Sequence, residues 1–467
     1  MIRIIFTILL VYFAYTAQLE AAIKLPAIFA DHMVLQREST THLWGKADPA
    51  KRVTVVTSWN LKRYTTQSDA EGNWKIAIST PKAGGPHTIM ITDGKALTLS
   101  NVMSGEVWLC SGQSNMEMPM KGYNSQPIEG SAMDILKSEN KNIRVFTVKK
   151  NHSLTPLTDV TGHWQEAMPV SVRDFSATAY YFGRLLNQML GIPVGLINSS
   201  WGGSQIEAWM TQEMLSTFPH IAIPVAEEKV SSPNKKPTYL YQAMIHPLEG
   251  IAVKGVIWYQ GESNLFNYQE YPALFEAMTN GWRARFNNPE MPFYFCQIAP
   301  YNYNPKENNS ALMREAQLKI AQTQPNTGMA VLMDTGEARN IHPSKKKEAG
   351  ERLALLALSK TYQMPGISSE SPVYKSIEIK DSVVTVLFDN APMGVAAANF
   401  ESKQFSLAGE DMVFHPARAR VSGAKVTVTC DKVKAPIAVR YAFENMVVGD
   451  LYGTDGLPVS SFRSDNW

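Results

Sequence analysis

A serine that follows a short apolar run is the first feature of the sequence that could act as a nucleophile. The run 107–110 has the composition of a buried strand, and Ser114 follows it within the sequence Ser-Gly-Gln-Ser-Asn. A serine at a strand end, beside free backbone N–H groups, is placed to attack a carbonyl carbon. Serine and asparagine are also ordinary turn and cap residues, so this stretch alone favours neither interpretation.

Three later strand-like runs also end in residues that could do chemistry. Residues 194–197 precede Asn-Ser-Ser-Trp-Gly-Gly-Ser, residues 256–259 precede Gln-Gly-Glu-Ser-Asn, and residues 329–333 precede a loop that ends in Ile-His-Pro. In an open parallel sheet, ligands bind beyond the carboxyl ends of the strands. These segments could therefore surround Ser114 with a base and an oxyanion hole.

Each of these segments also has an ordinary structural interpretation. His342-Pro343 is typical of a helix boundary, Gly202-Gly203 of a tight turn, and Glu262 of an ion pair. Trp201, Trp209 and Trp258 are residues that usually fill a core. The run Lys345-Lys346-Lys347 is typical of the solvated first turn of a helix. Only the four segments together favour a catalytic site.

The elements that would position these residues follow an alternating pattern. Strand-like runs are expected at 194–198, 255–259, 293–298 and 329–334, and helices at 176–190, 205–215, 268–286, 311–323 and 345–362. The run 143–148 is a further strand, either in the same sheet or in an excursion from it. Nearly continuous apolar strands between amphipathic helices predict a parallel sheet covered on both faces. We therefore expect a three-layer α/β domain over residues 104–362.

The flanking regions read as β structure. Short alternating or β-branched runs separated by turn residues predict a β-sandwich over residues 22–103, with residues 93–101 as the link to the next domain. After Pro365-Gly366 the β pattern returns, which predicts a β-rich region over residues 363–467. The last segment, 456–467, is expected to pack back on another domain.

Composition and the N-terminus limit the partners and the location. An early arginine, a short apolar run and small residues near Ala21 predict a signal peptide over residues 1–21, with export to the periplasm or the extracellular space. A net charge of +2 without a basic stripe predicts no nucleic-acid partner, and no later stretch is apolar enough to span a membrane. Three cysteines predict neither a disulfide framework nor a structural zinc site. The oligomeric state is left open.

The four segments carry a family resemblance. Gly-Gln-Ser-Asn-Met-Glu, Ser-Ser-Trp-Gly-Gly-Ser, Trp-Tyr-Gln-Gly-Glu-Ser-Asn and Ile-His-Pro resemble motifs of the sialate O-acetylesterase family, which belongs to the SGNH hydrolases with their flavodoxin-like fold. The similarity runs from about residue 25 to the last residues. It implies a serine esterase that removes O-acetyl groups from carbohydrates, with 9-O-acetylated sialic acids as the favoured substrate. The alternatives are an esterase for acetyl-xylan or another plant glycan, and a glycan-binding protein on an inactive scaffold.

The resemblance also implies roles for individual residues. Ser114 matches the nucleophile and His342 the general base. The N–H groups of Ser114 and Gly203 and the side chain of Asn264 match the oxyanion hole, with Gly202 as the neighbouring candidate for the glycine. Gln113, Trp201 and Gln260 are expected to contact the substrate, and neither a metal nor a cofactor is implied.

The residue that orients the base departs from the superfamily pattern. Many SGNH hydrolases carry an aspartate three residues before the histidine, but Arg339 stands at that position here. Glu262 and Asp334 are equally favoured as a catalytic carboxylate behind His342. Glu337 and a backbone carbonyl are further candidates, and with a carbonyl the site would be a Ser-His dyad.

Overall fold

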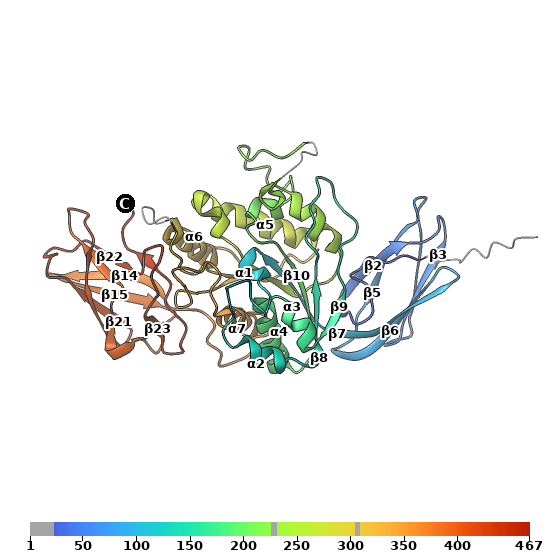
Figure 1. Ribbon diagram of the computed structural model, residues 1–467, viewed down its shortest axis with the longest axis horizontal. Coiled ribbons are helices and arrows are strands. Elements are labelled where there is room, and N and C mark those ends of the chain that lie inside the picture. Colours follow the sequence, from blue (N-terminus) through green and yellow to red (C-terminus); the bar gives the residue numbers. More distant parts are fainter. Residues whose placement is uncertain (1–22, 226–230, 304–308) are drawn as a thin grey trace, which may run out of the picture.

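The computed structural model describes residues 23–225, 231–303 and 309–467 of the chain. The predicted signal peptide, residues 1–21, lies outside the described residues. A central α/β region stands between two β-structured regions, the N-terminal one at one end of the molecule and the C-terminal one at the other (Figure 1). The fold therefore follows the predicted order of regions, with the α/β region in the middle.

A parallel sheet forms the centre of the molecule. Its strands are β7 (Ala96–Gly112), β8 (Asn140–Thr147), β10 (Val194–Ser200), β11 (Gly255–Tyr259), β12 (Phe293–Cys296) and β13 (Thr327–Ala330), with β9 (Trp164–Ala167) antiparallel at one edge. Their order is β13-β12-β11-β7-β10-β8-β9. The chain thus starts in the middle of the sheet, winds first to one side and then to the other, as in doubly wound flavodoxin-like folds. Gly112 pairs with Ser200 at the end of β10 and with Tyr259 at the end of β11. Ser114 therefore lies just beyond the ends of three adjacent strands.

Helices cover both faces of this sheet. They are α1 (Ser114–Glu117), α2 (Ser131–Leu136), α3 (Pro169–Asp174), α4 (Ala177–Leu190), α5 (Tyr271–Arg285), α6 (Asn309–Thr323) and α7 (Lys346–Leu356). Alternate residues of the strands belong to two apolar cores: Trp108 packs in the core of α4 and α7, and Leu109 in that of α5 and α6. Because strand side chains alternate between faces, this division makes three layers. The mixed α/β architecture is the predicted one.

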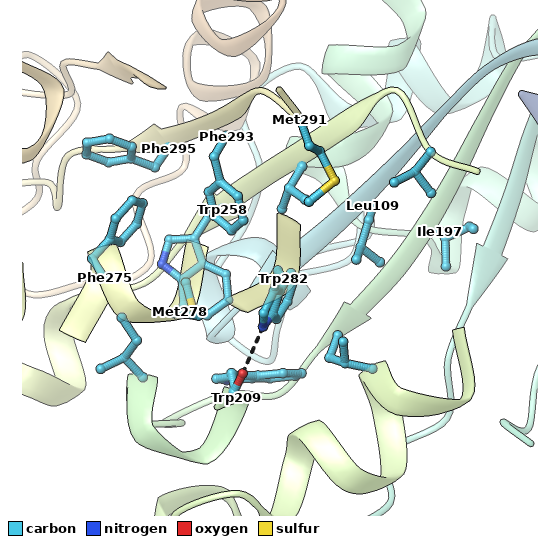
Figure 2. Packing of buried hydrophobic residues seen from close by; sticks show 14 of the residues in the cluster. Leu109, Ile197, Trp209, Trp258, Phe275, Met278, Trp282, Met291, Phe293 and Phe295 are labelled. Atoms are coloured by element: carbon cyan, nitrogen blue, oxygen red, sulfur yellow. Dashed lines mark hydrogen bonds between the residues drawn. The ribbon is translucent and has the colours of Figure 1, made fainter. Parts of the chain in front are cut away.

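An aromatic cluster fills the core between the sheet and α5. Trp258 of β11, Trp282 of α5 and Trp209 lie together in Figure 2, and the indole N–H of Trp282 donates to the carbonyl of Trp209 at 3.0 Å. The Trp258 and Trp282 rings meet edge to face at 6.1 Å between centroids. Truncating one such buried tryptophan costs about 3–5 kcal/mol. Trp209 and Trp258 are therefore core residues and do not face a ligand.

The predicted helices are present with one exception. Residues 176–190, 268–286, 311–323 and 345–362 form α4, α5, α6 and α7, the last extended by the π-turn Ala357–Thr361. The helix expected at 205–215 is wrong, because this segment has only the 3-10 turn η1 (Ile206–Trp209). The carboxylate of Glu207 binds the side chains of Asn264 and Asn267, and these tertiary contacts replace the helical conformation that the apolar spacing favours.

The N-terminal region is β-structured and continuous with the central sheet. Its strands are β1 (Val34–Gln36), β2 (Thr40–Lys46), β3 (Arg52–Thr57), β4 (Arg63–Gln67), β5 (Asn73–Ser79) and β6 (Gly84–Thr92). The expected link at 93–101 is instead a turn and the first part of β7, whose 17 residues pair with β6 near one end and with β10 and β11 near the other. One strand therefore joins the two regions, and it ends at Gly112, two residues before Ser114.

The C-terminal region is also β-structured. Its strands are β14 (Val373–Lys380), β15 (Val383–Asp389), β16 (Val395–Ala397), β17 (Glu401–Ser402), β18 (Phe405–Ala408), β19 (His415–Pro416), β20 (Arg418–Ser422), β21 (Lys425–Thr429), β22 (Ala438–Tyr441), β23 (Leu451–Gly453) and β24 (Phe462–Arg463). The final segment packs on α6, as expected: buried Arg314 donates to the Ser461 hydroxyl at 3.1 Å, and Arg463 pairs with Glu315 at 2.9 Å. The sandwich topology of either β region stays a prediction.

Two further features concern the whole described chain. Among residues 23–225, 231–303 and 309–467, no helix is both long and apolar enough to cross a membrane. Cys110 and Cys296 are buried in the central sheet and all three cysteines are free, so burial of the core stabilises the fold without crosslinks.

Candidate active site

The turn after β7 presents Ser114 at the edge of the central sheet. Gly112 has φ +134°, and a Cβ added there would lie 2.2 Å from the carbonyl oxygen of Tyr259, so only glycine fits. Gln113 then takes an extended conformation and α1 begins at Ser114. The N–H of the first helical residue has no acceptor within its own helix, so that of Ser114 is available to a ligand.

Side chains from α4 hold the short helix α1 in place. The Ser176 hydroxyl donates to the carbonyl of Met116 at 2.5 Å, and the Thr178 hydroxyl donates to the carbonyl of Asn115 at 3.0 Å. Ser176 also caps α4, since it accepts from the N–H of Ala179. A helix of four residues is unstable alone, so these tertiary bonds stabilise it and fix the direction of Ser114.

His342 lies beside Ser114 and makes one hydrogen bond with each ring nitrogen. Its Nε2 is 2.8 Å from the Ser114 hydroxyl, and its Nδ1 is 2.6 Å from Oε1 of Gln126. An amide oxygen can only accept, so Nδ1 carries the hydrogen and Nε2 is free to accept the serine proton. This is the tautomer that a general base for serine requires.

A tight turn carries Gln126 to the imidazole. The N–H and C=O groups of Tyr123 and Gln126 bond each other at 3.0 Å in both directions. Gly122 has φ +77°, and a Cβ there would lie 2.4 Å from the carbonyl oxygen of Gln126. The Tyr123 ring meets that of His342 edge to face at 5.3 Å. The turn therefore holds the imidazole by a hydrogen bond and by ring packing.

The structure corrects the expected orienting carboxylates. Glu262 accepts a hydrogen bond from the Asn115 amide at 2.6 Å. Asp334 forms a bidentate ion pair with Arg352 at 2.7 and 2.6 Å. Glu337 accepts from the N–H of Ser344 at 2.6 Å. Each carboxylate is engaged by another donor, and none of the three bonds Nδ1 of His342. The orienting group is neutral Gln126, and the arrangement is neither a carboxylate triad nor a dyad.

Burial sets the protonation state of the base. Removal from water lowers the pKa of His342 to about 4, and the nearby Lys346 ammonium acts in the same direction. No carboxylate at Nδ1 opposes this shift. His342 is therefore neutral at physiological pH, and its protonated form is a stronger acid than an ordinary imidazolium.

Two backbone N–H groups are available beside Ser114 as an oxyanion hole. Gly202 lies against the serine, since a Cβ added to it would be 3.2 Å from Cβ of Ser114, but its N–H already donates to Glu117 at 2.5 Å. Gly203, with φ +69°, has an N–H without an acceptor among the described residues. The geometry thus distinguishes the two glycines and favours Gly203, together with the N–H of Ser114.

Asn264, the expected third donor, is engaged by other residues. Its side chain is buried, and both hydrogens of the amide are engaged, one by Glu207 at 3.0 Å and the other by Asn267 at 3.1 Å. Its oxygen accepts from Ile206 and Gln260, which fixes the orientation of the amide. In this arrangement the amide hydrogens go to Glu207 and Asn267, so the donation to an oxyanion stays a prediction.

The three expected substrate contacts have different surroundings. Gln260 is fully buried and bonds Ser204, Asn264 and Tyr271, so it is a structural residue. Gln113 is buried too, and its side-chain oxygen accepts from the backbone N–H of Ser263 at 3.2 Å, which ties the serine turn to the segment after β11. Trp201 is half-buried under Lys150, whose ammonium lies 5.8 Å from the ring centroid. Of the three, Trp201 alone keeps substantial exposure.

Comparisons with known proteins identify the family of the chain. Residues 104–359 match the model of a family described as "Carbohydrate esterase, sialic acid-specific acetylesterase". The chain belongs to this family. It is 30% identical over 388 residues to the sialate O-acetylesterase of Homo sapiens, covering 74% of this chain and 72% of that protein. It is 29% identical over 418 residues to that of Mus musculus, covering 75% of each.

A solved structure extends the likeness to the whole fold. A carbohydrate acetylesterase from Xanthomonas citri superposes with a TM-score of 0.86 at 35% identity, covering 95% of this chain and 100% of that one. The present protein is thus a carboxylic ester hydrolase with a relative that shares its arrangement of regions. Among its described residues, no group of three or more His, Cys, Asp and Glu side chains is placed to hold a metal ion.

Three residues of this carbohydrate esterase escaped the sequence interpretation. Gln126 follows the turn-forming Gly-Tyr-Asn-Ser stretch, but a single glutamine has no catalytic signature. Glu117 ends the Gly-Gln-Ser-Asn-Met-Glu motif and was available as a signal. Lys346 was expected to be solvated and is instead buried, because its position on α7 faces the sheet while Lys345 and Lys347 face the solvent.

Proposed function

We propose that this protein is a serine esterase that removes O-acetyl groups from carbohydrates through an acetyl-enzyme. The observation that carries the proposal is the hydrogen-bonded chain Ser114–His342–Gln126, at 2.8 and 2.6 Å, beside the free N–H of Gly203. A nucleophile, an oriented base and a backbone donor free to bind an oxyanion are the parts that acyl transfer needs.

The first half of the reaction forms the acetyl-enzyme. His342 Nε2 takes the hydroxyl proton as Ser114 Oγ attacks the acetyl carbonyl carbon, and the N–H groups of Ser114 and Gly203 bind the resulting oxyanion. The intermediate collapses, the bond from the acetyl carbon to the sugar oxygen breaks, and the imidazolium protonates that oxygen. The deacetylated sugar then leaves.

The second half releases acetate and restores the serine. Water gives a proton to His342 Nε2 and attacks the acetyl-enzyme carbonyl, and the bond from that carbon to Ser114 Oγ breaks as the imidazolium returns its proton. Gln126 holds the ring in one tautomer throughout. Because Gln126 is neutral, it orients the imidazolium but stabilises it less than a carboxylate does, which suits rapid return of the proton.

The proposed substrate is a 9-O-acetylated sialic acid. The family description and the names of the mammalian relatives support an O-acetylated sialic acid without naming the position, whereas the Xanthomonas citri relative is named only as a carbohydrate acetylesterase. Acetate release from 9-O-acetylated N-acetylneuraminic acid should therefore exceed that from acetylated xylan. Release from xylan alone would reject the sialate proposal while leaving the esterase chemistry intact.

Location and inactive-scaffold binding are tested separately. We propose export through the predicted signal peptide, which rests on the charge and apolar run of residues 1–21. Expression of the full chain should yield acetylesterase activity outside the cytoplasm, and removal of these residues should retain it inside.

A serine-trapping organophosphate should label Ser114. An unlabelled protein that still binds acetylated glycans would support the binding-protein alternative.

A further inference from the structure

Three buried polar side chains beneath the candidate site have no part in the proposed reaction. They are Lys346 and Asn115, each 1% exposed, and Glu262, 9% exposed. Burial of a charged group costs several kcal/mol unless a partner of opposite charge and hydrogen bonds compensate for it. The burial of Lys346 and Glu262 therefore needs compensating contacts, and these contacts indicate what the two residues do.

Asn115 bridges the two charged residues. Its side-chain oxygen accepts from the Lys346 ammonium at 2.6 Å, and its side-chain nitrogen donates to Glu262 at 2.6 Å. The amide is thus aligned between a cation and an anion, and each half of it bonds the charge it complements. Hydrogen bonds to charged groups are among the stronger ones in proteins, so the orientation of Asn115 is well determined.

The same side chains bind the main chain on both sides of the base. Asn115 also donates to the carbonyl of Ile341 at 3.1 Å, and the Lys346 ammonium also donates to the carbonyl of Pro343 at 2.9 Å. These are the residues immediately before and after His342. Asn115 and Lys346 therefore hold the peptide groups that set the position of the imidazole.

Three separate elements meet in these contacts. Asn115 is the residue after the nucleophile in α1, Glu262 begins the 3-10 segment η5 (Glu262–Asn267) after β11, and Lys346 begins α7. Glu262 has a second oxygen, Oε2, that is buried without a hydrogen-bond partner among the described residues. Hydrogen bonds therefore compensate only part of the cost of burying this carboxylate. Its charge opposes that of the Lys346 ammonium, so we assign Glu262 the role of counter-ion to Lys346.

We propose that Lys346, Asn115 and Glu262 form a positioning network that holds the peptide groups flanking His342 and thereby keeps the imidazole at hydrogen-bond distance from Ser114. The inference rests on the proposed function, since positioning has meaning only if Ser114 and His342 react. None of the three touches the reacting atoms. They act through His342, and Glu262 acts through the other two.

The network also affects the charge around the base. Burial lowers the pKa of Lys346 to about 7 against the opposing effect of Glu262, and burial raises the pKa of Glu262. The buried Tyr259 and Cys296, which also face the network, stay protonated because burial raises their pKa values. Further titratable groups near His342 are Glu337 in the loop, Glu117 on α1 paired with Lys150, and Tyr123 beside the ring. Tyr271 and Tyr303 lie near Glu262, and burial raises the pKa of each.

The sign of the electrostatic effect on His342 is clear. Lys346 is a cation at acidic pH and lowers the pKa of His342, so its removal raises that pKa. The base is active when neutral. Hence kcat/KM of a variant without the ammonium should begin to fall at a higher pH than in the wild type.

Lys346→Met tests the network, with Lys345→Met as the matched control on the exposed neighbouring residue. For Lys346→Met we expect kcat for 4-nitrophenyl acetate to fall about 10- to 100-fold, because small displacements of a base cost factors of this size. KM should stay within about threefold, and the acidic limb of kcat/KM should move to higher pH. Wild-type kcat and an unmoved limb in folded Lys346→Met would overturn the proposal.

A second variant keeps the test decisive if Lys346→Met does not fold. Asn115→Ala retains both charges but removes the bridge and the bond to Ile341, and it should lower kcat with KM retained. Folded Asn115→Ala with wild-type kcat would contradict the network. Ser114→Ala separates the two levels: if it still hydrolyses the ester, the proposed function fails, whereas an inactive Ser114→Ala beside fully active network variants rejects the network alone.

Discussion

The nucleophile turn, residues 112–117, and the base loop, residues 334–345, are held in place by different means. Main-chain geometry sets the path of the nucleophile turn through a strand end, a glycine with φ +134° and the first turn of a helix, and the hydroxyls of Ser176 and Thr178 support it. The base loop lies outside the helices and strands and contains one isolated β-bridge, Glu337–Asn340. Side chains from elsewhere hold it, among them Gln126 on His342 and Asn115 on Ile341.

This difference explains why the two halves of the site tolerate change differently. A position fixed by main-chain sterics depends on few residue types and fails when a side chain no longer fits. A position fixed by hydrogen bonds from several side chains loses accuracy by degrees as each bond is removed. We therefore expect substitution of Gly112 to act in an all-or-none manner and the removal of single hydrogen bonds around the base loop to act in steps.

The largest expected effect is the loss of either reacting side chain. Ser114→Ala and His342→Ala should each lower kcat for acetate release by about 10³-fold or more, since nucleophile and base act as a unit. The double variant should be no worse than the worse single one. Steady-state assays with circular dichroism as the folding control measure this, and multiplicative losses would show that the two residues do not act together.

Gly112→Ala should have the next largest effect, on folding. A Cβ at this position would lie 2.2 Å from the Tyr259 carbonyl at a positive φ, so we expect a loss of about 3 kcal/mol or more in the free energy of unfolding. Gly191→Ala is the matched control, since φ is +66° there and no atom lies within 4 Å of the added Cβ. Its cost should be near 1 kcal/mol. Equal midpoints in urea for both variants would refute steric control of the turn.

The predictability of the site follows the same division. Ser114, Gly203 and the central sheet were accessible from the sequence, because a strand that ends in glycine and polar residues has a recognisable pattern. Gln126 was not accessible, since it reaches His342 across 216 positions of the chain through one side-chain contact. Asp334 was misassigned for the converse reason. It was expected to end a strand over 329–334, but β13 ends at Ala330, and Arg352, 18 residues later, binds the carboxylate of Asp334 in the turn that follows.

Removal of the orienting amide should have an intermediate effect on turnover. Gln126→Leu keeps the size of the side chain but leaves Nδ1 of His342 without an acceptor, so the imidazole can adopt the wrong tautomer. We expect kcat to fall about 10- to 100-fold, with KM within about threefold. Gln67→Leu, on exposed β4, is the control for the substitution itself. Wild-type turnover in Gln126→Leu would assign the orientation of the ring to Tyr123 packing alone.

The smallest expected effect concerns the pH dependence of the base loop. Since the pKa of His342 is lowered to about 4, kcat/KM of the wild type should stay constant through neutral pH and fall as pH drops through that value. Gln126→Glu places a carboxylate at Nδ1, which stabilises the imidazolium and should raise the pKa of His342 by about 1–2 units. The acidic limb should therefore move upward while the plateau changes little, because Glu accepts the same hydrogen bond. An acidic limb that stays near pH 4 in Gln126→Glu would mean that the 2.6 Å contact with Nδ1 does not control the charge of the ring.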